Sequence, residues 1–443
     1  MSRDMQLAEA VLGLVGRRAE AEVVVSSGTL SLTRFANSFI HQNVAEEGDA
    51  IGLRVSLDGR VATAKTTATE PNALAAFVDH ALATAAMQPV DEDWPGLVEP
   101  TSTEDPGHVD EATFDASPTD RAAVVKDFVD AGDGLLAAGF CQTEGHSVSF
   151  ANTAGHTARG RYSTAILDGI HQTGTSAGTG HAASVALGDL DGSAVGALAA
   201  QRAVESATPF DAKPGEYEVV LAPEAVGTIA VFLAFYGFNG KALEEKQSFV
   251  KLGEQQFDER FQMWDDVTDA RAMGIAFDTE GTPKGRTDFV VDGVTRGVAH
   301  SRKTAKRLGV ASTGHHHPGA EGWGPIATNV FVGGGASPVG DLIAGVERGI
   351  YVSTFNYCRI LDPKTMVVTG LTRNGTFMIE NGRITGAVTN LRFTQSFVQA
   401  LGPGRVLGVG NDLRYADSEF GAGVVRAPSL HLAGWNFTGG AEG

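Results

Sequence analysis

The stretch LAPEAVGTIAVFL (residues 221–233) decides how the second half of the chain begins to fold. The overlapping run EYEVVLA (residues 216–222) predicts a buried strand, and Pro223 then opens an apolar helix, because proline suits a first helical position. Glu224 therefore lies at a strand-to-helix junction, where a general base could lie. The neighbourhood offers no nucleophile, histidine or cysteine to work with it, so a helix-dipole partner is the plainer interpretation.

Length and composition limit the class of protein. A chain of 443 residues suggests two or three domains and is long enough for a well-buried interior. Its 56 glycines favour turns and sheets over long helices. A net charge of −19, with no basic block beyond SRKTAKR (residues 301–307), argues against direct nucleic-acid binding.

The cysteine count and the absence of long apolar runs indicate the compartment. Only Cys141 and Cys358 are present, and no apolar run is long enough to cross a membrane. We therefore expect a cytoplasmic location, no membrane contact and two buried, unreactive thiols.

Periodicity and turn signals predict an α+β chain. Alternating runs over residues 30–48 and 50–68 predict antiparallel strands with a hairpin turn at Asp58-Gly59, and helices are expected over residues 71–87 and 119–138. Two more hairpin turns are expected at Asp292-Gly293 and Asn381-Gly382.

Proline and glycine near residue 212 mark the best domain boundary. We expect residues 1–212 to form an N-terminal α+β domain, an α/β-sandwich-like unit with an antiparallel sheet. Residues 213–443 are expected to form a β-rich, metallopeptidase-like domain with few helices.

The histidine run TGHHHPGAEG, with His315, His316 and His317, is one candidate metal site. On an extended segment His315 and His317 share a face and could chelate a divalent cation, but a third ligand would have to come from elsewhere. A solvated loop is the alternative and the plainer interpretation, because glycine and proline surround the run.

Acidic residues crowd the stretch MWDDVTDARAMGIAFDTEGTPKGRT (residues 263–287). They could bind a hard cation through carboxylate oxygens, although their spacing is not that of an EF-hand, and a solvated turn region is the default. The residues are Asp265, Asp266, Asp269, Asp278 and Glu280.

Taken together, several segments resemble the TldD/PmbA family, whose members are described as zinc metallopeptidases and modulators of gyrase. The resemblance covers nearly the whole chain. It is carried by RFANSFIHQN (residues 34–43), KLGEQQF (251–257), DTEGTPKGRTDFVVDGV (278–294), TAKRLGVASTG (304–314), ERGIYVSTF (347–355), FMIENGRI (377–384) and VGNDLR (409–414).

In zinc-carrying members the opening helix begins HExxxH and a cysteine near the C-terminus completes the site. The matching positions here are Pro223, Glu224 and Thr228, and residues 415–425 contain no cysteine. Neither proline nor a threonine hydroxyl replaces an imidazole or thiolate on zinc. The resemblance thus implies that Glu224 is a vestigial motif glutamate and that this chain holds no metal of its own.

The resemblance implies a PmbA/TldE-type subunit. Such a subunit would join a zinc-bearing, TldD-type HExxxH partner, shape a closed chamber and help to hold an extended peptide for proteolysis. Two alternatives remain open. One is a stand-alone amide-bond enzyme acting on a small biosynthetic intermediate through Glu224, Cys358 or the histidine run. The other is a non-enzymatic, gyrase-modulating binding protein.

Overall fold

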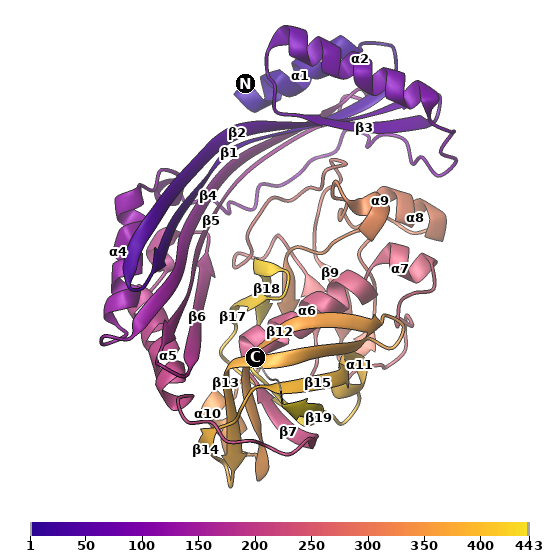
Figure 1. The fold of residues 1–443 in the computed structure, drawn as a ribbon. Helices are drawn as coiled ribbons and strands as arrows, with labels where there is room; N and C mark the ends of the chain where they lie inside the picture. The colour runs from indigo at the N-terminus through magenta and orange to yellow at the C-terminus, as the bar shows by residue number, and fades with distance from the viewer. Residues whose placement is uncertain (1, 441–443) are drawn as a thin grey trace.

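A long curved sheet wraps around a sheet-rich C-terminal part in the computed structural model, which describes residues 2–440 (Figure 1). All neighbouring strands of this sheet are antiparallel, in the order β3-β2-β1-β4-β5-β6. The strands are β1 (Glu20–Ala36), β2 (Phe39–Leu57), β3 (Arg60–Thr66), β4 (Leu136–Asn152), β5 (Thr157–Gln172) and β6 (Ala177–Ser184).

Helices cover the outer face of this sheet at both of its ends (Figure 1). At one end α1 (Arg3–Val15) and α2 (Pro71–Met87) pack on β1 and β2 through a core that includes Val11, Val23 and Val78. At the other end lie α3 (Glu111–Phe114), α4 (Pro118–Asp130), the short η1 (Leu187–Asp189) and α5 (Gly192–Glu205). The inner face of this sheet carries no helix at these positions and faces the C-terminal part (Figure 1).

The sequence predictions for local structure are confirmed with one exception. Asp58-Gly59, Asp292-Gly293 and Asn381-Gly382 all have positive φ at hairpin turns, and α2 spans the predicted residues 71–87. The helix expected over residues 119–138 is wrong at its end. It stops at Asp130, because Asp133 and Gly134 take left-handed φ values of 45° and 89°, and β4 begins at Leu136.

Two further sheets form the C-terminal part. One has the order β10-β9-β8-β11-β18-β17. In the other, β12 pairs with both β7 and β13, so the path β12-β7-β19-β15-β13 closes on itself. The strands are β7 (Gly215–Leu221), β8 (Met263–Asp265), β9 (Thr287–Val291), β10 (Val294–Thr295), β11 (Val330–Val332), β12 (Arg348–Asp362), β13 (Val367–Glu380), β14 (Arg383–Ala387), β15 (Leu391–Ser396), β16 (Val406–Val409), β17 (Arg414–Ser418), β18 (Gly421–Ala427) and β19 (Leu430–Gly440).

A buried helix, α6 (Pro223–Phe232), packs between these two sheets. All ten of its residues are buried, and Ile229 and Phe232 belong to the largest apolar core. The π-helix η2 (Leu233–Gly237) continues it. The other helices are short: α7 (Gly240–Glu244), α8 (Arg302–Leu308), α9 (Ala320–Trp323), α10 (Val339–Ala344) and α11 (Phe397–Ala400).

The expected α+β class, with an antiparallel N-terminal sheet and a sheet-rich C-terminal part, is confirmed. Residue 212 falls between α5 and β7. No helix between residues 2 and 440 is long and apolar enough to cross a membrane.

Candidate functional site

Glu224 lies in the first turn of α6, and its side chain is almost completely buried. Arg414 Nη2, on β17, lies 2.9 Å and 3.2 Å from the two carboxylate oxygens, and Arg202 Nη2, on α5, lies 3.8 Å away. Burial opposes ionisation, but the two guanidinium groups outweigh it and hold the pKa of Glu224 at about 2. A carboxylate held so firmly in its ionised form is a weak general base.

Pro223 and Thr228 do not provide metal ligands around this carboxylate. The Thr228 hydroxyl donates to the carbonyl oxygen of Glu224 at 3.3 Å. Pro223 and Thr228 are five positions apart. On a regular α-helix, side chains at this spacing point about 140° away from each other, so the two do not share a face. The π-helical turn that could correct such a spacing begins only at Leu233.

Strand β17 packs tightly against α6 next to Glu224. Gly227 faces Ala416 of β17 so closely that a Cβ atom at Gly227 would lie 2.6 Å from the Ala416 Cβ atom. Across residues 2–440, no group of three or more His, Cys, Asp and Glu side chains could hold a metal ion. The residues at this site therefore do not fit zinc.

A second polar group lies near Glu224 at the junction of the two parts of the chain. His181 of β6 is buried, and its Nδ1 lies 3.2 Å from Asp168 Oδ2 on β5. Burial, reinforced by repulsion from Asp168, raises the pKa of Asp417 on β17 to about 6. Asp168 and Asp417 line a pocket of about 330 Å³. The sequence offered no signal for this group, because its members come from three separate strands.

The solvated-loop interpretation of the histidine run is wrong for His315. That side chain is buried, with Nε2 at 3.0 Å from Asp265 Oδ1 and Nδ1 at 2.8 Å from Thr313 Oγ1. Asp265 also accepts the backbone N–H of Asn329 at 2.6 Å. His315 is therefore a buried hydrogen-bonding residue that holds two loops together.

His317 does not join His315 in a chelating pair. Its Nδ1 accepts the backbone N–H of Gly319 at 3.0 Å, and its Nε2 lies 3.1 Å from the carbonyl oxygen of Gly324. Both ring nitrogens of each histidine are thus in contact with protein groups. These contacts give no support to the metal-binding alternative for His315 and His317.

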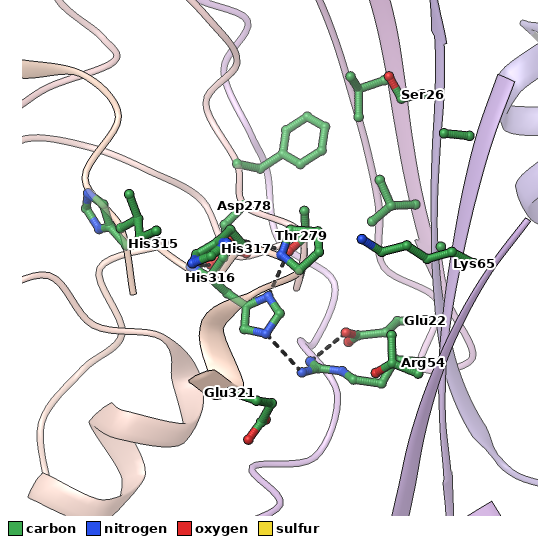
Figure 2. A pocket seen from close by; sticks show the side chains of 18 of the residues that line it. Glu22, Ser26, Arg54, Lys65, Asp278, Thr279, His315, His316, His317 and Glu321 are labelled. Atoms are coloured by element: carbon green, nitrogen blue, oxygen red, sulfur yellow. Dashed lines mark hydrogen bonds and ion pairs between the residues drawn. The ribbon is translucent and has the colours of Figure 1, made fainter. Parts of the chain in front are cut away.

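A cavity of about 1520 Å³ lies between the inner face of the N-terminal sheet and the central loops of the C-terminal part (Figure 2). Strands β1, β2 and β3 form one wall. Loops around residues 273–284 and 314–329 form the other. A cavity of this size at a junction between domains is a common position for a ligand site.

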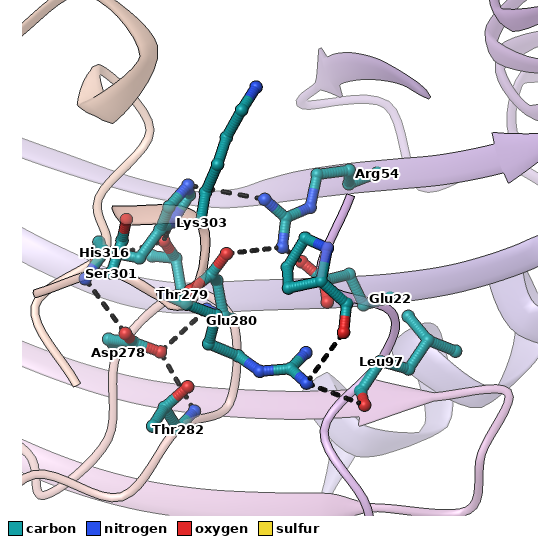
Figure 3. Close-up of polar contacts among 12 residues, drawn as sticks. Glu22, Arg54, Leu97, Asp278, Thr279, Glu280, Thr282, Ser301, Lys303 and His316 are labelled. Carbon is teal, nitrogen blue, oxygen red and sulfur yellow. Dashed lines mark hydrogen bonds and ion pairs between the residues drawn. The ribbon is translucent and has the colours of Figure 1, made fainter. Parts of the chain in front are cut away.

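A buried charge network contributes residues to the lining of this cavity (Figure 3). Arg54 of β2 lies 2.5 Å from Glu22 of β1 and 2.9 Å from Glu280 of the central loop. Its Nη1 also lies 3.4 Å from His316 Nε2. One guanidinium therefore joins the N-terminal sheet to the C-terminal part.

The solvated-turn interpretation of the acidic stretch is wrong for four of its five residues, which are buried, whereas Asp269 is half-buried; the four are Asp265, Asp266, Asp278 and Glu280. Asp278 accepts the backbone N–H groups of Glu280, Thr282 and His316, each at 2.9 Å. Burial and then repulsion from Glu280 raise the pKa of Asp278 to about 7. These carboxylates organise the loop.

The network carries more carboxylates than nearby cations can balance. Burial raises the pKa of Glu22 to about 8, against the attraction of Arg54. Burial also lowers the pKa of His316 to about 4, so its neutral ring accepts from Arg54 through Nε2 and donates from Nδ1 to Thr279 Oγ1 at 2.7 Å. Sequence reasoning missed Glu22 and Arg54, which look like ordinary charged strand residues.

Comparison with known families supports the metallopeptidase character of the fold. Residues 214–439 match the family model "PmbA/TldA metallopeptidase C-terminal domain", and residues 21–85 match "PmbA/TldA metallopeptidase domain 1". The fold is thus that of a metallopeptidase family. The chain belongs to the TldD/PmbA family.

Curated relatives match part of the chain. A metalloprotease of Synechocystis is 32% identical over 35% of this chain and 35% of its own length. A metalloprotease TldD homologue of Haemophilus influenzae is 26% identical over 48% of this chain and 45% of its own. The chain thus spans less than half the length of these relatives.

Solved structures share the fold over almost the full length. TldE from Thermococcus kodakarensis has a TM-score of 0.87 at 18% identity, covering 98% of this chain and 99% of that one. A putative modulator of DNA gyrase from Bacteroides thetaiotaomicron has a TM-score of 0.86 at 20% identity, covering 99% of both chains.

Proposed function

We propose that this chain is a metal-free, TldE-type subunit of a metallopeptidase complex that processes or degrades peptides. The observation that carries the proposal is the fixation of Glu224 between Arg414 and Arg202, with proline and threonine at the positions of the zinc ligands. A carboxylate neutralised by two arginines, without a metal-bound water, has nothing to activate.

The proposal places the chemistry in a partner. That partner is a TldD-type subunit whose HExxxH motif binds zinc, while this chain shapes the chamber and holds an extended peptide. We expect a pseudo-two-fold hetero-complex with a total interface above roughly 2,000 Å², as permanent complexes usually bury. Two free cysteines and acidic charge favour a cytoplasmic location without direct nucleic-acid contact.

The alternative of a stand-alone amide-bond enzyme has less support. Burial raises the pKa of the Cys358 thiol and keeps it protonated, which makes it a poor nucleophile. His315 and His317 are engaged with protein groups. No observation favours the gyrase-binding alternative over a peptidase subunit.

Glu224→Gln tests the proposal in the assembled complex. The glutamine amide retains a side-chain oxygen for Arg414 but cannot act as a base, so peptide turnover should stay within about twofold of the wild-type value. The matched control is the same change in the HExxxH glutamate of the partner, which should abolish turnover. A loss of about a hundredfold from Glu224→Gln alone would show that α6 of this chain performs chemistry.

A further inference from the structure

The sheet wall of the large cavity carries a row of side chains that differs from the charge network. Val24, Gly52 and Lys65 lie opposite one another on β1, β2 and β3, so they share one face of the sheet. All three line the cavity. The middle position has no side chain, so the row forms a shallow floor with an apolar end and a cationic end.

Lys65 differs from the other cationic side chains that line this cavity. Arg54 is bound by Glu22 and Glu280, and Lys303 lies 2.9 Å from Asp91 and 3.2 Å from Glu321. The Lys284 ammonium binds Thr328 and Asn329, at 2.9 Å and 3.2 Å. Lys65 makes no hydrogen bond or ion pair with a described residue, and its ammonium group points across the cavity toward His317 (Figure 2). An anionic group of a ligand would meet a cation that has no competing carboxylate.

The loop wall opposite carries a group of apolar side chains beside its polar ones. Met273, Ile275, Phe277 and Ile326 line it, and Ile275 and Phe277 pack with Val24 and Val148 of the sheet. With Lys65 at the other wall, the cavity combines an apolar surface with one uncompensated positive charge. This combination fits an apolar chain that ends in a carboxylate.

The cavity also reaches the free edge of β3. Its lining includes Val61 and Thr63 on one face of β3, Ala62 on the other face, and Gln88 beyond α2. Apart from β2, the only described pairing of β3 is a single bridge from Arg60 to Val90. Beyond this bridge, the backbone N–H and C=O groups that face away from β2 have no described strand partner, so they can pair with an added strand, which a peptide can supply and a fatty acid cannot.

We propose that this cavity binds the apolar C-terminal end of an extended peptide, with the terminal carboxylate on Lys65 and the peptide backbone along the edge of β3. The inference rests on the proposed function only in taking peptides as the ligand class. It assigns to this chain a preference for free, apolar C-termini, at a site separate from α6.

Binding to the isolated full-length chain tests this site without a partner. The probes are fluorescein-labelled hexapeptides, measured by fluorescence anisotropy, that end in Val-Ala-Val with either a free carboxylate or a C-terminal amide. A peptide ending in Ser-Gly-Ser with a free carboxylate is the polar control, and palmitate is the competitor. The free acid should bind about tenfold more tightly than the amide, because a charge-assisted hydrogen bond is lost with the amide.

Two variants separate the carboxylate from the apolar surface. Lys65→Met should reduce the preference for the free acid to about onefold, whereas Lys364→Met, at an exposed lysine between β12 and β13, should keep the tenfold preference. Gly52→Leu should weaken both peptides by about tenfold or more, because the new side chain fills the floor of the cavity. The sheet can accept this change, since a Cβ atom at Gly52 meets only the Val24 carbonyl oxygen, at 4.0 Å.

Three results would contradict the proposed peptide site. They are equal binding of the acid and the amide, a preference for the acid that persists in Lys65→Met, and peptide binding that Gly52→Leu does not change. Equal binding of the Ser-Gly-Ser peptide, or a cavity that binds palmitate but neither apolar peptide, would also contradict it. If the peptides bind as expected and the chain joins no HExxxH partner, the proposed function fails while the site stands. If the complex assembles and turns over peptide but the isolated chain shows no acid preference, only the site fails.

Discussion

Replacing Arg54 with methionine is expected to lower the melting temperature by about 3–5 °C, because removal of one partner from a buried ion pair costs about 3–5 kcal/mol. The Arg54 side chain is only 11% exposed and is shared by Glu22 and Glu280, which are 3% and 0% exposed. Without it the ionised Glu280 is buried without its guanidinium partner, and Glu22, which is largely protonated at pH 7, loses the same contact. Methionine preserves most of the apolar volume of the arginine side chain. The fall in melting temperature therefore measures the loss of the charge and not the creation of a cavity.

The control for this variant is Arg34→Met. Arg34 is an exposed arginine on β1 of the same sheet, and it makes no ion pair with any described residue. Its melting temperature should stay within about 1 °C of the wild-type value. Thermal melts followed by circular dichroism at pH 7 measure both variants. Equal melting temperatures for Arg54→Met and Arg34→Met would mean that the network does not hold the N-terminal sheet against the central loops.

The second large effect depends on pH and concerns Glu22. Burial raises the pKa of Glu22 in the folded chain to about 8, above its ordinary value of 4.5. The folded state therefore holds a proton that the unfolded state has released, so this contribution to stability is present below pH 4.5 and is lost as the pH rises through 8. The charged groups that face Glu22 are Arg54 on β2, Asp278 and Glu280 in the central loop, and Arg302 on α8.

Glu22→Gln removes this titration while retaining a neutral side chain of the same shape. At pH 5 the variant and the wild type should melt together, and at pH 9 the variant should melt about 5 °C higher. Glu47→Gln, at an exposed position on β2, should follow the wild-type profile throughout. Melting curves from pH 5 to 9 decide the matter, and parallel profiles for Glu22→Gln and wild type would contradict a raised pKa at Glu22.

Local signals in the sequence predicted much of the local structure. The Asp-Gly and Asn-Gly turns need positive φ, which few other residue pairs adopt at low cost, so each of the three could be located from two letters. The helix over residues 71–87 could be predicted because Pro71 sets its start and apolar residues recur along one face. The end of α4 could not be predicted, because apolar residues 136–138 continue a helical pattern while their pairing with β5 decides their strand conformation.

The residues around Glu224 illustrate what local patterns miss. Glu224 could be found as a family-like motif residue, but Arg202 lies 22 positions before it and Arg414 lies 190 after it. Only the tertiary fold brings the three together: β17 packs on α6, and Arg202 approaches Glu224 from α5. The interpretation of Glu224 as a vestigial residue did not predict its contacts with Arg202 and Arg414, the first of which joins the two parts of the chain. In the same way, the buried state of Asp278 depends on the N-terminal sheet that covers the loop.

The central claim is that zinc belongs to the partner and not to this chain. It is tested most directly by copurifying the chain with its HExxxH partner, separating the two subunits after mild chelation and measuring the zinc in each by mass spectrometry. The account predicts about one zinc per partner chain and less than about a tenth of an equivalent in this chain. About one tightly held zinc per copy of this chain, lost on substitution of Glu224 or His317, would contradict it.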